Sequence, residues 1–212
     1  MNTKLVKRML AATLAATFMF ATVVTAGATT QSSEGSSSGS SSTPAPASIA
    51  AETSTISVGG AVIKTQLPGS YYIPASSAIA GVAVRQSAAT IRAALGLAGN
   101  QTPYVRAFEI TSAKSPAAWA SFQAAANGLG AVVLGAVNID LGAMTGGKFS
   151  SLPATAQVPT TIGVKNANGR TLAVVKVLPG GATEILQDTD DNPNTVTFNI
   201  GGGLAAYAVI AY

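Results

Sequence analysis

The sequence predicts a mainly β protein, α+β overall, in which residues 131–212 form an antiparallel β-sandwich. Short apolar segments follow one another through this region, separated by turns that contain Gly, Asn and Asp. In segment 195–200, Val196, Phe198 and Ile200 alternate with polar residues, which is the period of a half-buried strand. The short connections favour antiparallel neighbours. The expected strands are 132–139, 158–164, 171–178, 183–187, 195–200 and 204–212.

Residues 1–28 have the features of a secretory signal peptide. Lys4, Lys7 and Arg8 precede an uncharged apolar stretch, which ends in the small residues Ala26-Gly27-Ala28. The alternative is an uncleaved anchor, because about 20 apolar residues can span a bilayer. Several threonines in the stretch and its small-residue end favour cleavage. We therefore expect a secreted protein, extracellular or associated with the cell surface, with no membrane span after cleavage.

Residues 29–55 change abruptly to Ser, Gly, Thr, Ala and Pro. Such a composition buries too little apolar area to offset the entropy lost on ordering, so it predicts a disordered tether. A tether that follows a signal peptide is typical of a domain held away from a surface outside the cell.

Composition excludes several kinds of chemistry. The chain has no Cys and no His, which excludes histidine acid–base catalysis and Cys/His metal sites. Three of its 12 basic residues lie in the signal segment, so the remainder is close to neutral against 8 acidic residues. No Lys/Arg cluster follows residue 8, and we expect no nucleic-acid partner.

Residues 56–130 predict a small mixed segment with two short helices. Gly59-Gly60 is expected to turn between two strands, and further strands are expected near residues 71–73, 79–84 and 104–110. Ser87 is an N-cap for the first helix. The second helix begins at Ser115-Pro116 and ends near Gly128. Its spaced apolar residues predict a core-facing stripe, made of Trp119, Phe122, Ala126 and Leu129.

The C-terminal region resembles a small β-sandwich module that closes many secreted and cell-wall proteins of Gram-positive bacteria. The last strand of that module typically reads Phe-Ser-Thr-Tyr-Ala-Leu; this chain keeps Tyr207-Ala208 but has Leu204-Ala205-Ala206 before it. The resemblance implies an immunoglobulin-like, extracellular and non-catalytic stalk or adhesive module. It covers residues 131–212 and rests on the segments 173–177, 181–186, 195–198 and 204–210.

The loop between residues 188 and 194 is the sharpest local pattern. Asp188, Asp190, Asn192 and Asn194 place oxygen ligands at every second residue, as calcium loops require. However, Pro193 stands where such a loop needs glycine. Asp, Asn and Pro are also the residues expected in a hairpin turn, because they hydrogen-bond their own backbone or preset φ. We expect a turn and no cofactor, with calcium binding as the open alternative.

Two further sets of residues carry functional alternatives. Tyr71 and Tyr72 could stack on a sugar, or form a strand pair with one ring buried and one exposed. Glu109 and Asp140 lie in apolar strands and are the candidates for a carboxylate pair.

Three functions follow from these patterns. The first is a secreted or surface-exposed non-catalytic structural or interaction module, which binds an extracellular polysaccharide or protein. The second is a carbohydrate- or calcium-dependent binding domain that uses Tyr71, Tyr72 and the loop at 188–194. The third, least favoured, is a hydrolase that uses Glu109 and Asp140.

Overall fold

Twelve strands and two helices build residues 54–153 and 155–212, the part of the chain that the computed structural model describes. The expected signal peptide and residues 29–53 of the expected tether lie outside these residues. Within them, no helix has both the length and the apolar character needed to cross a membrane. The elements are β1 (Thr55–Val58), β2 (Ala61–Lys64), β3 (Gly69–Tyr72), β4 (Ile79–Val84), α1 (Ala88–Ala94), β5 (Gln101–Ile110), α2 (Pro116–Gly128), β6 (Val132–Thr145), β7 (Lys148–Ser151), β8 (Val158–Val164), β9 (Leu172–Val177), β10 (Thr183–Gln187), β11 (Thr195–Ile200) and β12 (Gly203–Ala211).

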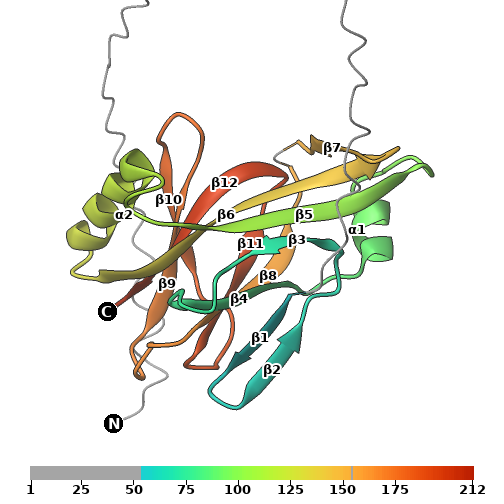
Figure 1. Cartoon of the computed structure of the whole chain (residues 1–212). Helices are drawn as coiled ribbons and strands as arrows, with labels where there is room; N and C mark the ends of the chain where they lie inside the picture. Colours follow the sequence, from blue (N-terminus) through green and yellow to red (C-terminus); the bar gives the residue numbers. More distant parts are fainter. Residues whose placement is uncertain (1–53, 154) are drawn as a thin grey trace, which may run out of the picture. The chain divides into compact units, whose positions relative to one another are not determined.

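The largest sheet has the strand order β10-β9-β12-β6-β5-β3, and β7 pairs with the end of β6 (Figure 1). All pairings in it are antiparallel except the one between β3 and β5, which is parallel. The 14-residue β6 is the longest strand, and it pairs with β5 along one side and with β12 and then β7 along the other. A second sheet has the order β11-β8-β4 and is antiparallel throughout.

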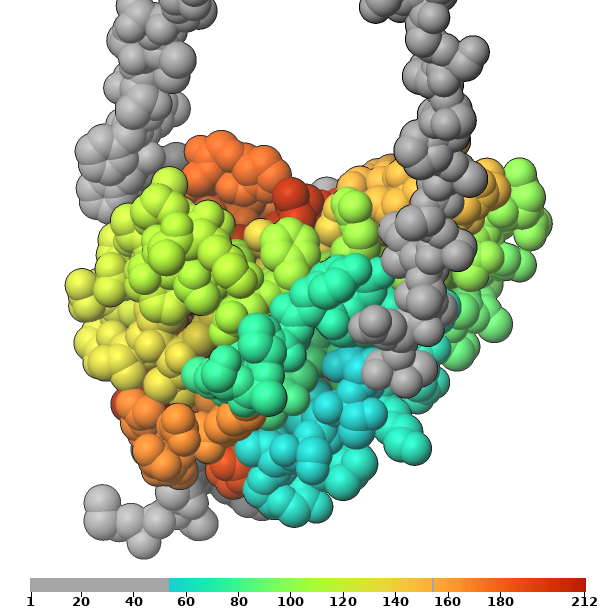
Figure 2. Space-filling model, in the orientation of Figure 1, coloured from blue at the N-terminus to red at the C-terminus, as the bar shows by residue number. Residues whose placement is uncertain are grey.

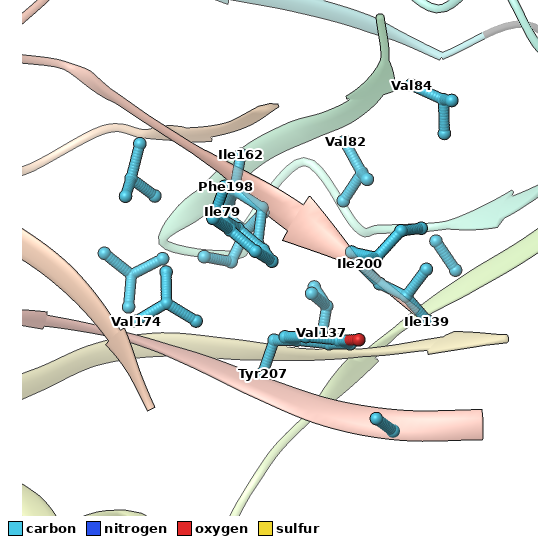
Figure 3. Close-up of a cluster of buried hydrophobic side chains, with 14 of the residues drawn as sticks. Ile79, Val82, Val84, Val137, Ile139, Ile162, Val174, Phe198, Ile200 and Tyr207 are labelled. Atoms are coloured by element: carbon cyan, nitrogen blue, oxygen red, sulfur yellow. The ribbon is translucent and has the colours of Figure 1, made fainter. Parts of the chain in front are cut away.

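The two sheets face each other across the main hydrophobic core. Val137, Ile139 and Tyr207 of the large sheet meet side chains of the small sheet, as Figure 3 shows. Tyr207 is 1% exposed, and its ring centroid lies 5.3 Å from that of Phe198. The partners from the small sheet include Val82, Ile162, Phe198 and Ile200, each 2% exposed or less.

The helix α2 covers part of the opposite, outer face of the large sheet (Figure 1). Phe122 is fully buried and Ala126 is 1% exposed beneath it, against Ile110, Ala208 and Ile210 of the sheet. Trp119 is partly buried, and its ring lies edge-on to that of Phe122 at 6.5 Å between centroids. The predicted core-facing stripe is therefore correct for these residues, whereas Leu129 is 40% exposed.

The β1–β2 hairpin packs on the small sheet through a close contact at Gly163. Ile56 of β1 is fully buried, and a Cβ atom on Gly163 would lie 2.4 Å from its Cγ2 atom. The absence of a side chain at this position of β8 therefore lets the hairpin approach the sheet. The turn of the hairpin is Gly59-Gly60, as predicted, and both glycines have positive φ.

The mainly β architecture, the two helices and the antiparallel sheets confirm the coarse prediction. Ser87 caps α1 by accepting a hydrogen bond from the Thr90 amide, and Pro116 is the first residue of α2. One feature differs from expectation. The chain on either side of residue 130 contributes strands to both sheets, and one compact unit contains both parts. The last strand, β12, lies inside the large sheet, between β9 and β6.

Candidate functional site

Side chains from the strands of the large sheet form one continuous row on its outer face. The strand register places Tyr72 beside Phe108, and Phe108 opposite Asn138. Asn138 in turn is opposite Ala206, and Ala206 is opposite Val177. Because directly paired residues project from the same face of a sheet, these five side chains lie side by side across β3, β5, β6, β12 and β9.

The neighbouring rows differ in what covers them. On one side, Ile110, Ala136 and Ala208 are buried beneath α2. On the other side, the register aligns Arg106, Asp140 and Leu204. Leu204 is 44% exposed, so this second row reaches the surface at its β12 end. In the first row Ala206 and Val177 are buried in the cluster beneath α2, whereas Tyr72 and Phe108 are exposed. The exposed part of the two rows therefore lies mainly over β3 and β5, with Leu204 at the β12 end.

Arg106 and Asp140 form an ion pair at the centre of the second row. The Arg106 Nη2 atom lies 2.6 Å from the Asp140 Oδ2 atom, and the Asp140 side chain is 3% exposed. Ser151 of β7 donates a hydrogen bond of 2.8 Å to the other carboxylate oxygen. Both oxygens of the buried carboxylate therefore have a partner, as burial of a charge requires.

Phe149 of β7 fixes the guanidinium of Arg106 from above. The Arg106 Cζ atom lies 3.9 Å from the centroid of the Phe149 ring, a cation–π contact. The ring also lies edge-on to Tyr104, at 6.2 Å between centroids. It rests on Gly142, where a Cβ atom would lie 2.3 Å from the Phe149 Cζ atom. Glycine at this position therefore allows β7 to close over the end of the sheet.

We define the open face as the surface formed by Tyr72, Phe108, Asn138, Arg106 and Leu204. Tyr72 is 62% exposed, Phe108 is 38% exposed and the Arg106 side chain is 41% exposed. In Figure 2, green atoms of β5 and red atoms of the C-terminal segment come to the surface between α2 (yellow-green) and β7 (amber). This surface thus presents two aromatic rings, an amide and a guanidinium that Asp140 and Phe149 hold in place.

Tyr71 points away from the open face and into the core. It pairs with Ala107, on the inner face of β5, and packs against the main hydrophobic cluster. Its hydroxyl donates to the Leu67 carbonyl at 3.1 Å and lies 3.0 Å from the Thr65 Oγ1 atom. Burial raises the pKa of Tyr71 to about 12, with a smaller opposing effect from the hydrogen bond to Thr65. Of the two tyrosines considered as ligand-binding residues, only Tyr72 is exposed on the open face.

The buried tyrosines predict a loss of stability at high pH. The pKa of Tyr71 is raised from an ordinary value of 10.0, and burial raises the pKa of Tyr207 as well. Because the folded state holds these protons more tightly, the contribution of the two tyrosines to the free energy of unfolding should be constant below pH ~10 and decrease between pH ~10 and ~12. Tyr71 alone should contribute about 2–3 kcal/mol to this decrease. Urea unfolding at several pH values measures it.

Tyr71→Phe is the informative variant, since it removes one of the ionising groups. Its free energy of unfolding should decrease less steeply with pH than that of the natural chain. Tyr72→Phe removes a hydroxyl from the exposed neighbour and is the matched control for the substitution itself. Equal slopes for Tyr71→Phe and the natural chain would contradict the assignment.

The loop between β10 and β11 is a series of turns closed by its own side chains. The Oδ1 atoms of Asp188, Asp190 and Asn192 each accept a hydrogen bond from the backbone amide two residues later, at 2.8–3.0 Å. This pattern is the one expected when Asp and Asn direct turns. Asp188 also accepts from the Thr197 amide, which ties the loop to β11.

Asp190 continues this arrangement into the small sheet. Its carboxylate accepts hydrogen bonds from the hydroxyls of Thr195 and Thr197, the latter at 2.6 Å. The Thr197 hydroxyl lies 2.7 Å from that of Thr161. No group of three or more His, Cys, Asp or Glu side chains that could hold a metal occurs within residues 54–153 and 155–212. The alternating oxygens of Asp188, Asp190, Asn192 and Asn194 thus lie in a loop whose geometry is that of a turn.

Glu109 and Asp140 do not share a site. Asp140 pairs with Arg106 on the outer face of the sheet, whereas Glu109 pairs with Val137, which faces the core between the sheets. Because side chains alternate along a strand, the two carboxyl groups project from opposite faces. This placement does not allow them to act together on one glycosidic bond.

Sequence reasoning missed Arg106, Phe108, Asn138 and Leu204. Each lies within an expected strand or at its start, but apolar residues occupy both the odd and the even positions of these strands, so the outward-facing positions do not stand out. In β5, for example, Val105 and Ala107 face the core, while Tyr104 and Phe108 lie on the outer face. The alternation of Arg106 with Val105 and Ala107 was the available signal that one face of this strand reaches the surface.

Comparison with protein-family models, with curated proteins and with solved structures found no match to this chain.

Proposed function

We propose that this chain is a secreted or surface-exposed, non-catalytic interaction module that binds its partner through the open face. The observation that carries the proposal is the row in which Tyr72 and Phe108 stand side by side, 62% and 38% exposed. Exposed aromatic side chains that cluster on one surface are typical of binding sites, because they bury a large area at little entropic cost. The rigid sheet beneath them holds their positions.

The two-sheet body suits the role of a stalk or adhesive module. We propose the immunoglobulin-like class that the resemblance of residues 131–212 implies, extended by β3, β4 and β5 from the preceding segment. A tether between the signal peptide and this body would hold the open face away from the cell. The non-catalytic assignment is supported by the composition, without His or Cys, and by the separation of Glu109 from Asp140.

Substitution of the aromatic pair tests the proposal. The probes are extracellular polysaccharides and matrix proteins immobilised on a surface, and the secreted protein is passed over them. In a Tyr72→Ser, Phe108→Ser variant, the affinity for whichever probe binds should decrease about tenfold or more, because each ring contributes on the order of 1 kcal/mol.

Val62→Ser is the matched control, because Val62 is 66% exposed but lies on the β1–β2 hairpin, away from the open face. Its affinity should equal that of the natural chain. If the aromatic variant binds as tightly as the control, the open face is not the binding surface.

A further inference from the structure

We infer that the open face binds an acidic polysaccharide, one whose sugar rings carry carboxylate groups. This inference rests on the proposed function and names the ligand class of the same surface. The pyranose rings would stack on Tyr72 and Phe108, and a carboxylate would pair with the exposed side of Arg106. The spacing of the rings suits a sugar, and the state of the guanidinium and the distribution of charge support an acidic sugar over a neutral one.

The aromatic pair provides a platform that suits a sugar ring. Tyr72 and Phe108 occupy paired positions on adjacent strands, so their Cβ atoms are about 5 Å apart. The aliphatic C–H face of a pyranose packs on aromatic rings, while its hydroxyl groups remain free to hydrogen-bond. Asn138, next in the row, offers both a donor and an acceptor to those hydroxyls.

Arg106 is held in place without being saturated. Asp140 takes the Nη2 atom and Phe149 covers one side of the guanidinium, yet the side chain remains 41% exposed. A guanidinium that is already oriented loses little entropy when its exposed side binds a carboxylate. Arg106 lies two residues from Phe108 on the same face, about 7 Å away along β5.

Of the ion pair on this surface, the positive partner is the one that reaches solvent, since the Arg106 side chain is 41% exposed and that of Asp140 is 3% exposed. Among the acidic side chains of residues 54–153 and 155–212, Asp140 is the only one on the outer face of β3, β5, β6 and β12. Its two oxygens are directed at Arg106 and Ser151, beneath the surface. An approaching carboxylate therefore meets the exposed guanidinium before it meets any negative charge.

The first test compares polymers that differ only in charge. Polygalacturonate, alginate and hyaluronan are titrated into the secreted protein, each beside its methyl-esterified form, which has the same rings without the carboxylate charge. At least one acidic polymer should bind, and esterification should weaken its binding about tenfold or more. Raising NaCl from ~0.1 M to ~1 M shortens the Debye length from ~10 Å to ~3 Å. It should therefore weaken the binding of the acidic polymer but not that of its ester.

The second test removes the charge of Arg106 without leaving Asp140 unpaired. In the Arg106→Gln, Asp140→Asn variant, a neutral hydrogen-bonding pair replaces the ion pair, and its melting temperature verifies folding. This variant should bind the acidic polymer no better than its ester, whereas the natural chain separates the two. The Tyr72→Ser, Phe108→Ser variant should lose binding to both the acidic polymer and its ester.

Three results would overturn the inference. One is equal affinity for an acidic polymer and its ester; another is tight binding of poly-glutamate in place of every polysaccharide. The third is no binding of any acidic polymer while another partner binds through Tyr72 and Phe108, in which case the proposed function stands without this ligand. If no partner's binding depends on Tyr72 and Phe108, the proposed function is overturned as well.

Discussion

Replacing Arg106 with methionine should lower the free energy of unfolding by about 3 kcal/mol, because the substitution leaves the buried Asp140 carboxylate without its counter-ion. The value is at the lower end for broken buried pairs, since Arg106 is partly exposed and water can reach the vacated space. The cation–π contact with Phe149 is lost as well. Urea unfolding followed by tryptophan fluorescence at Trp119 measures the change.

A second substitution distinguishes the unpaired charge from the loss of packing. In Arg106→Met, Asp140→Leu the charge is gone, and most of the lost stability should return, because apolar residues of similar volume often replace an ion pair without cost. If the single variant is as stable as the natural chain, the ion pair does not stabilise the junction of β5, β6 and β7. If the double variant is no more stable than the single one, packing is the main contribution.

Phe122→Ala should destabilise the protein by about 3–5 kcal/mol, the usual cost of removing a fully buried phenylalanine ring. The ring is the main buried contact between α2 and the outer face of the large sheet. Its removal opens a cavity next to Ile110 and Ile210, which the rigid sheet cannot collapse to fill. Thermal and urea unfolding both measure the loss.

The neighbouring residue Gln123 provides the matched control. It is exposed in the same helix, so Gln123→Ala should change stability by less than about 0.5 kcal/mol. A similar small change for Phe122→Ala would mean that α2 is not anchored by this ring.

Local patterns predicted most individual elements, because each depends on residues close together in the chain. The strands β8, β10 and β11 have the predicted bounds, and the caps of both helices lie where Ser87 and Pro116 indicate. The strand β6 is longer than predicted: it continues past Ile139 to Thr145, through the polar Asp140. Asp140 interrupts the apolar pattern of this segment. The residue that neutralises its charge, Arg106, comes from a different strand and could not be identified from the segment alone.

The candidate site was not predictable in the same way, because it depends on which strands pair and in which register. Tyr72 and Phe108 are 36 positions apart, and the pairing between β3 and β5 brings them together. This pairing is parallel, whereas the sequence led us to expect antiparallel strands. For Tyr71 and Tyr72 the sequence left two interpretations open, stacking on a sugar and a strand pair with one ring buried and one exposed. It could not indicate which ring of such a pair is buried, since a shift of one residue in register would exchange them.

The central position of β12 has a consequence for how the chain folds after synthesis. In the large sheet, β9 and β10 are joined to β6, β5 and β3 only through residues 203–211. The sheet therefore cannot be completed until those residues have left the ribosome. Until then the strands on either side of β12 lack the partner that joins them. Completion of the sheet is therefore expected at the slow rate set by pairings between distant strands.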